Sequence, residues 1–164
     1  MNKYMKLAND LATSNLLTND GGPFGAVIVK NNKIIGKGKN QVLKKNDPTA
    51  HAEIMAIRNA CQNLKTHDLS GCVLYTTCYP CPMCISAIIW SNIKTVYFGN
   101  TKKDAADIGF RDDFIYEYLD NQKGNNYLKL EQIDYDKTIN AFKQFKDKDD
   151  KTIYWGEIWY IKWD

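Results

Sequence analysis

The amino-acid sequence predicts an α/β fold, and three observations support this prediction. Segments with helical spacing of apolar residues alternate along the chain with short β-branched segments such as 26–30 and 95–99. Gly, Pro and Asn lie between these segments, as they do at turns. The chain has 164 residues, which is long enough for one hydrophobic core without covalent support.

The first part of the chain predicts a helix followed by a β-hairpin. Residues 2–17 carry apolar side chains at helical spacing. The segment AVIVK, residues 26–30, is short and rich in β-branched residues, which is typical of a buried strand. Asn31 and Asn32 form a turn signal, so we expect residues 33–39 to pair back against that strand.

Two helices and two strands are expected in the middle of the chain. The sequence NDPT predicts a helix start, with Asp47 as the N-cap and Pro48 in the first turn, and this helix should run over about 49–64. The expected elements that follow are a strand over 73–77, a helix that opens at Pro82 and a strand over 95–99.

The last third of the chain has weaker signals. We expect a loop over 100–111, a short helix over 114–119, a fifth strand over 127–133 and a helix over 137–146. The sequence contains no internal repeat or low-complexity linker, so residues 1–150 are predicted to form a single domain.

Residues 151–164 form an aromatic C-terminal tail that holds three of the four tryptophans. Its apolar residues fit either a helical or a strand face, so periodicity does not decide between the two. The tail is either a segment docked on the core or an arm that closes a pocket or crosses to a partner subunit. Clustered exposed aromatic residues mark contact surfaces, so the alternative of an arm stays open.

Composition limits the class of protein. The net charge of +3 is spread among interspersed acids and bases, so a dedicated nucleic-acid surface is not expected. No apolar run approaches the roughly 20 residues of a membrane span, and the N-terminus lacks the apolar run of a signal peptide. Five cysteines, an odd number, argue against a disulfide framework. A cytoplasmic protein is expected.

Two short motifs bring metal-binding residue types together. HAE supplies His51 and Glu53, and PCPMC supplies Cys81 and Cys84, which share one face of a helix. His51, Cys81 and Cys84 make three possible ligands, and a catalytic zinc has three protein ligands and an open position for water. Two thiolates neutralise the zinc charge, so the water benefits from a separate base, and Glu53 is placed for that role.

Several alternatives remain open from the residues alone. The CxxC pair could be a redox pair, and Cys78 could complete a structural zinc site with four ligands. A non-catalytic zinc module that binds a partner through the tail is a third alternative, although such a module needs no base at Glu53. Residues His51 and Glu53 lie on nearly opposite sides of an ideal helix, so His51 must project along the axis at the helix start.

At these motifs the sequence resembles the cytidine-deaminase superfamily and, within it, the small zinc-dependent bacterial guanine deaminases. The resemblance implies a three-layer α/β/α sandwich around a mixed five-stranded sheet, and zinc-dependent hydrolysis of guanine to xanthine and ammonia. It runs from about residue 20 to 120 and more thinly to the end. The stretches that carry it are 21–30, 46–53, 74–84 and 104–119.

The resemblance also implies roles for individual residues. Glu53 would move protons, while one zinc ion would be held by His51, Cys81 and Cys84. The guanine base would stack on Phe24 and hydrogen-bond to the Asn40 amide and the Ala52 backbone N–H. Asp112 would supply a carboxylate for the base, and Tyr154 of the tail would close the site. The four side chains also have plain structural alternatives in the core, a turn, a cap or packing.

One residue departs from the pattern of the resembled family. Tyr79 stands where these guanine deaminases usually have Glu, which removes a carboxylate close to the zinc ligands. Tyr79 is therefore a candidate specificity residue, and the substrate could instead be cytosine, another amino-heterocycle or adenosine in transfer RNA. The resemblance further implies a homodimer, with exchange of the C-terminal segment in some members.

Overall fold

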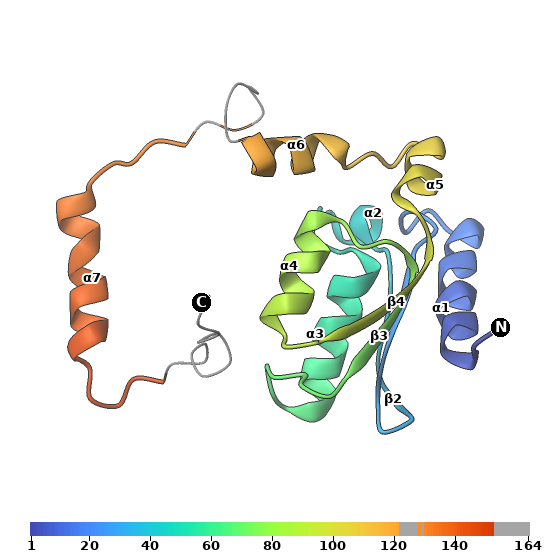
Figure 1. Ribbon diagram of the computed structural model, residues 1–164, viewed down its shortest axis with the longest axis horizontal. Helices are drawn as coiled ribbons and strands as arrows, with labels where there is room; N and C mark the ends of the chain where they lie inside the picture. The colour runs from blue at the N-terminus through green and yellow to red at the C-terminus, as the bar shows by residue number, and fades with distance from the viewer. Residues whose placement is uncertain (122–127, 129, 153–164) are drawn as a thin grey trace, which may run out of the picture. The chain divides into compact units, whose positions relative to one another are not determined.

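The computed structural model describes residues 1–121, 128 and 130–152 (Figure 1). The chain divides into two compact units, Met1–Gly124 and Asn125–Asp164, and each is described by itself. The aromatic tail and Tyr154 lie outside the described residues, so the predictions made for them stay predictions.

The first unit is built on a mixed four-stranded sheet. Its strand order is β2-β1-β3-β4, and the strands are β1 (Gly25–Lys30), β2 (Lys33–Lys39), β3 (Val73–Cys78) and β4 (Thr95–Asn100). Strand β1 runs antiparallel to both β2 and β3, whereas β3 and β4 are parallel. The predicted hairpin and the strands over 73–77 and 95–99 are confirmed.

The prediction of five strands is wrong for the described chain. Residues 128 and 130–133, which are the described part of the expected fifth strand, are not in a strand. Leu128, Leu130 and Ile133 are all exposed there. An apolar segment forms a strand only where one of its faces is covered and its backbone finds a partner strand. The described residues of this segment have neither in the described structure.

Helices cover both faces of the sheet, which gives the expected three layers (Figure 1). Helix α1 (Lys3–Ser14), extended by a short 3-10 turn (Asn15–Leu17), packs on one face against β1 and β3. Helix α3 (Ala52–Leu64) packs on the other face against β2 and β1, with α4 (Pro82–Trp90) beside it.

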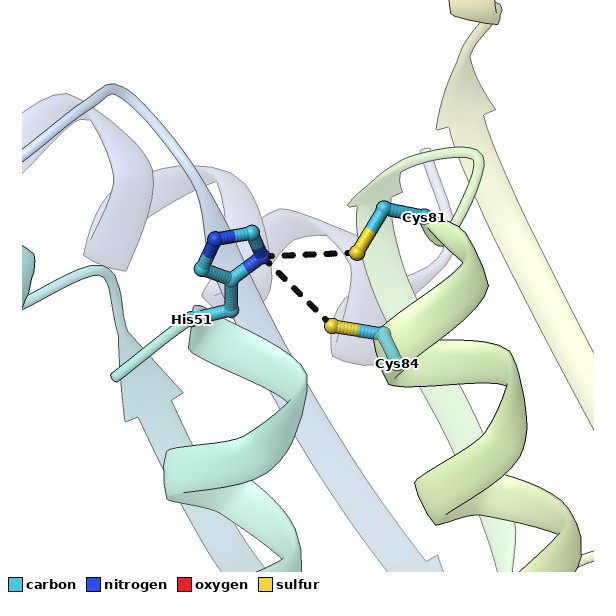
Figure 2. Close-up of side chains that lie close together, drawn as sticks. All are labelled: His51, Cys81 and Cys84. Carbon is cyan, nitrogen blue, oxygen red and sulfur yellow. Dashed lines mark hydrogen bonds between the residues drawn. The ribbon is translucent and has the colours of Figure 1, made fainter. Parts of the chain in front are cut away.

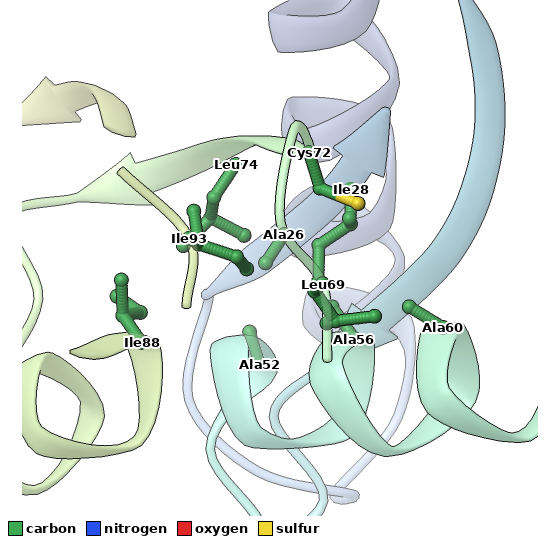
Figure 3. Packing of buried hydrophobic residues seen from close by; sticks show 10 residues of the cluster. All are labelled: Ala26, Ile28, Ala52, Ala56, Ala60, Leu69, Cys72, Leu74, Ile88 and Ile93. Atoms are coloured by element: carbon green, nitrogen blue, oxygen red, sulfur yellow. The ribbon is translucent and has the colours of Figure 1, made fainter. Parts of the chain in front are cut away.

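Strand β1 is buried from both sides, which explains its continuous apolar sequence. Ala26 and Ile28 belong to the cluster that packs against α3 and α4 (Figure 3). Val27 and Val29 face the opposite way and pack with Tyr4 and Ala8 of α1. The alternation of side chains along one strand therefore joins the two helical layers.

The helix predicted over 49–64 begins later than expected. Helix α3 starts at Ala52, and His51, not Asp47, is the N-cap. The Asp47 carboxylate instead accepts hydrogen bonds from the backbone N–H and the hydroxyl of Thr49, at 2.8 and 2.6 Å. Asp47 therefore closes a local turn with Thr49 instead of capping the helix, and Asp is suited to both roles.

Two helices were not expected. Helix α2 (Val42–Lys45) is a single turn, and α5 (Lys102–Asp107) lies in the segment predicted as a loop. Thr101 and Asp104 form a reciprocal capping box that starts α5, so this part of the prediction was wrong. The helices predicted over 114–119 and 137–146 are confirmed as α6 (Asp113–Asn121) and α7 (Tyr135–Asp147), the latter in the second unit.

Within the described residues, no helix has both the length and the apolar content that a membrane crossing requires.

The contact between β2 and α3 depends on glycine. A Cβ on Gly38 would lie 2.1 Å from the Ala52 carbonyl oxygen and 2.5 Å from the Ala56 amide nitrogen. We expect Gly38→Ala to lower the free energy of unfolding by about 1–3 kcal/mol, because backbone must move to admit the methyl group. Thermal unfolding measures it, and the exposed neighbour Lys37→Ala is the control. Equal melting temperatures for the two variants would contradict this packing.

Candidate metal centre and substrate cavity

The predicted metal ligands lie at the starts of two neighbouring helices. His51 is the N-cap of α3 and Cys81 is the N-cap of α4, and both have extended backbone conformations. Because His51 precedes the helix, its side chain is free of the helical spacing that would place it opposite Glu53. Figure 2 shows its ring directed toward Cys81 and Cys84 at the start of α4.

The geometry of this group fits zinc. His51 Nδ1 lies 3.6 Å from Cys81 Sγ and 3.6 Å from Cys84 Sγ (Figure 2). All three ligand atoms lie within 4.8 Å of one another. In a tetrahedral site, bond lengths of about 2.3 Å to sulfur and about 2.0–2.1 Å to nitrogen separate the two atoms by about 3.6 Å. The donor set and its spacing therefore match a tetrahedral zinc with one open position.

The protonation of the two thiols differs. A hydrogen bond from Cys84 and the proximity of His51 lower the pKa of Cys81 to about 4. The same Cys81 contact, together with burial, raises the pKa of Cys84. The Cys81 contact also raises the pKa of His51. Metal ligands bind in their deprotonated forms, so a cation that binds this group would displace the thiol protons.

Glu53 lies one residue inside α3 and is almost fully buried. Its Oε1 accepts a hydrogen bond from the Thr76 hydroxyl at 3.2 Å, and its Oε2 accepts one from the Cys84 thiol at 3.5 Å. Burial raises the pKa of this carboxyl above its usual range. A carboxyl group with a raised pKa beside a metal site is suited to accept and return protons near neutral pH.

Cys78 lies close to this group but does not belong to it. Among the described residues, the set that could hold a metal comprises His51, Cys81 and Cys84. The Cys78 thiol donates to the Thr101 carbonyl at 3.6 Å, and burial raises its pKa to about 11. A thiol at neutral pH with its own acceptor is a packed residue, so the geometry does not support a fourth zinc ligand.

A cavity of about 640 Å³ opens next to the metal-binding group. This is within the usual range for small-molecule sites. Among the described residues, it brings together the predicted site residues from five separate segments of the first unit, except Cys84, which is buried and does not line it. The predicted residues that line it are Phe24, Asn40, His51, Ala52, Glu53, Tyr79, Cys81 and Asp112.

Polar groups in the cavity are placed by their backbone positions. Ala52 is the first residue of α3, so its N–H has no acceptor within the helix. The Asn40 side-chain oxygen accepts from the Val42 N–H at 3.2 Å, which directs the amide nitrogen elsewhere. Asp112 immediately precedes α6, and its partial burial raises the pKa of its carboxyl.

Tyr79 forms part of the cavity wall and is held by its neighbours. Its ring packs edge-on against Phe98, with centroids 5.1 Å apart. The Lys102 ammonium lies 4.7 Å from the centre of the Tyr79 ring and 3.5 Å from the centre of the Tyr116 ring. Lys102 therefore links α5 and α6, through cation–π contacts, to the segment that carries Cys81 and Cys84.

Phe110 is a cavity residue that the sequence analysis missed. It follows α5 and its ring packs edge-on against Phe24, with centroids 4.9 Å apart. A Cβ on Gly22 would lie within 2.8 Å of both rings. The capping box at Thr101 was the available signal, since a helix there brings the following residues back toward the site.

Residues 1–100 match the family described as the cytidine and deoxycytidylate deaminase zinc-binding region. The chain belongs to this family, whose zinc-binding region contains both ligand motifs. Among individual relatives, the guanine deaminase of Bacillus subtilis is 42% identical over 92% of this chain and 97% of its own. Its X-ray structure matches with a TM-score of 0.89, at 41% identity, over 94% of this chain and all of the other.

Transfer-RNA deaminases are also related, over less of the chain. The tRNA-specific adenosine deaminase of Aquifex aeolicus is 37% identical over 77% of this chain and 81% of its own length. A structure of guanine deaminase from Nitrosomonas europaea matches with a TM-score of 0.62, at 34% identity, over 66% of this chain and 63% of the other. Of these three relatives, the Bacillus subtilis protein shares the largest part of this chain.

Proposed function

We propose that this protein is a zinc-dependent guanine deaminase, which converts guanine and water to xanthine and ammonia. The observation that carries the proposal is the match to a guanine deaminase over 92% of the chain, including the segment that holds Phe110 and Asp112. Support also comes from the cavity, which joins a three-ligand group, a buried carboxyl and aromatic walls.

His51, Cys81 and Cys84 are the proposed ligands. When bound, zinc supplies a Lewis acid that activates a water molecule for attack at C2 of guanine. Glu53 accepts one proton of that water and gives it to the adjacent ring nitrogen. It then moves the second proton to the amino group, which leaves as ammonia when its bond to C2 breaks. Thr76 keeps one Glu53 oxygen oriented through its 3.2 Å hydrogen bond.

The base is held by the walls of the cavity in this proposal. Phe24 stacks on the ring, while the Asn40 amide and the Ala52 N–H bind acceptors on its edge. Asp112 accepts from a ring or amino N–H that guanine presents. Support comes from the shared cavity and from the raised pKa of Asp112, which shows partial removal from water. A buried acceptor distinguishes bases by their hydrogen-bond donors.

The assembly and location belong to the same proposal. We propose a homodimer in which the C-terminal tail, including Tyr154, helps to close a site. Trp90 of α4 and the β4 residues Tyr97 and Phe98 are exposed and offer apolar contact area. A cytoplasmic location is supported by five free cysteines, which stay reduced there. Light scattering measures the mass, and a tail deletion at residue 150 tests the role of Tyr154.

A substrate panel tests the proposed activity. The zinc-loaded protein is assayed for ammonia release from guanine, guanosine, adenine and cytosine, and for adenosine conversion in transfer RNA. We expect the value of kcat/KM for guanine to exceed each of the others by at least about 100-fold, since an unpaired buried polar group rejects the wrong base. Preferential turnover of transfer RNA or of another base would overturn the assignment of guanine.

Tyr79 tests whether an aromatic wall replaces the usual carboxylate. We expect Tyr79→Ala to raise KM for guanine about tenfold, because the contacts to Phe98 and Lys102 are lost and the cavity wall recedes. Tyr79→Phe keeps the ring and should leave KM within about twofold of the wild type. Steady-state kinetics measure both, and equal KM values for the two variants would remove Tyr79 from the base-binding wall.

A further inference from the structure

The buried side chain of Asn15 connects the two cavity segments that contain Gly22 and Asn40. Asn15 follows α1 at the start of the 3-10 turn, and only 3% of it is exposed. Its side-chain nitrogen donates to the Gly22 carbonyl at 2.8 Å and to the Asn40 carbonyl at 2.8 Å. One buried amide group thus uses both of its N–H donors on the backbone of cavity residues.

These two bonds complete a closed circuit of hydrogen bonds. The Gly22 carbonyl also accepts from the Phe24 N–H at 2.8 Å. The Phe24 carbonyl in turn accepts from the Asn40 N–H at 3.0 Å. Asn15 therefore joins the backbones that carry Phe24 and Asn40, which are the two proposed contacts to the base on this wall.

There is little room for this wall to rearrange. A Cβ on Gly21 would lie 2.1 Å from the Asn40 side-chain oxygen. That oxygen is itself fixed by the Val42 N–H. A small shift of the Gly22 or Asn40 backbone would therefore move the Asn40 amide, which lies at the cavity surface.

Within the part of the chain that the structure describes, the side-chain oxygen of Asn15 has no partner, which indicates that the two N–H donors are the reason for an asparagine here. Among the described residues, Asn15 Oδ1 is a buried side-chain atom without a hydrogen-bond partner. A buried unpaired acceptor is a cost that an apolar side chain would avoid. The reversed amide orientation would set this oxygen against two carbonyl oxygens, so the two carbonyls fix which way the amide points.

We propose that Asn15 is a positioning residue for the base-binding wall, and this inference rests on the proposed function. It acts through the backbones of Phe24 and Asn40 and sets the affinity for the base. His51, Cys81 and Cys84 lie at the starts of α3 and α4, whereas the side-chain nitrogen of Asn15 donates to Gly22 and Asn40. We therefore expect metal content and the chemical step to be independent of Asn15.

Asn15→Leu tests this role, since leucine fills a similar volume without hydrogen bonds. We expect KM for guanine to rise about tenfold, with kcat within about twofold and zinc content unchanged, because two hydrogen bonds are lost on the binding wall only. Calorimetry with guanine in a Glu53→Gln background, which binds but does not react, should show the same weakening of Kd. Asn15→Ser, which is too short to reach both carbonyls, is the second variant if leucine prevents folding.

Val29→Ala is the matched control. Val29 is buried in the same layer, between α1 and the sheet, and does not line the cavity. It should lower the melting temperature while KM and Kd stay at wild-type values. An Asn15 variant with unchanged Kd, or with Kd shifted no more than in Val29→Ala, overturns the inference. If the wild type does not act on guanine, the proposed function fails, and the same comparison is made with the base that it does act on.

Discussion

Glu53→Gln should abolish deamination and leave the metal centre intact. We expect kcat to fall by about 10²- to 10⁴-fold, because the buried carboxyl is the group placed to move protons between water and the base. Zinc content should stay at one ion per chain, since Glu53 lies outside the ligand set. Ammonia release and metal analysis of the same sample measure the two quantities together.

The Glu53→Gln substitution also separates an effect on catalysis from an effect on stability. Burial disfavours the charged form of Glu53, so removing its charge should leave the melting temperature equal or higher. Thr76→Val is the graded control, because it removes the 3.2 Å hydrogen bond that orients the carboxylate but keeps the carboxylate. We expect it to cost less than Glu53→Gln. A Glu53→Gln protein with wild-type kcat would exclude Glu53 from catalysis, and the proposed mechanism with it.

Replacing a zinc ligand should remove both metal and activity. Cys81→Ser and His51→Ala each leave two of three ligands. We expect zinc affinity to fall by more than the 10- to 100-fold that loss of an outer-shell partner typically costs. Dialysed protein should then hold well under one zinc per chain and show no ammonia release. Metal analysis after dialysis against a weak chelator measures the loss.

Cys78→Ser is the matched control for the ligand variants. It replaces sulfur by oxygen, as Cys81→Ser does, three residues away along the chain. The Cys78 thiol, however, donates to the Thr101 carbonyl and lies outside the group of His51, Cys81 and Cys84. Its zinc content should equal that of the wild type. If Cys78→Ser loses zinc as Cys81→Ser does, Cys78 is a fourth ligand and the structural-zinc alternative regains support.

The proximity of the predicted zinc ligands Cys81 and Cys84 could be predicted because it depends on short-range sequence. Cys81 and Cys84 are three residues apart at a helix start marked by Pro82, so local geometry alone places both thiols together. The position of His51 needed the structure. Asp47 competes for the helix cap and closes a turn with Thr49 instead, which moves the start of α3 onto Ala52.

The sheet was predictable where burial is complete and not where pairing is required. Strand β1 is covered on both faces, so its apolar run is sufficient evidence. Residues 127–133 include four apolar residues, but apolar side chains alone cannot supply a partner strand. The cavity wall was only partly predictable. Phe110 lines it after α5, and Lys102 of α5 contacts its residue Tyr79. The start of α5 depends on a capping box at Thr101 and Asp104 more than on apolar periodicity.

Zinc-dependent deamination of guanine by this chain can be measured in one assay. Guanine is followed by ultraviolet spectroscopy with the zinc-loaded protein while ammonia is assayed in parallel. We expect xanthine and ammonia to form in equal amounts, to stop when a chelator removes the zinc and to resume when zinc is restored. Fully zinc-loaded, folded protein that leaves guanine unchanged would contradict the claim, and Tyr79→Glu would then be the first variant to assay.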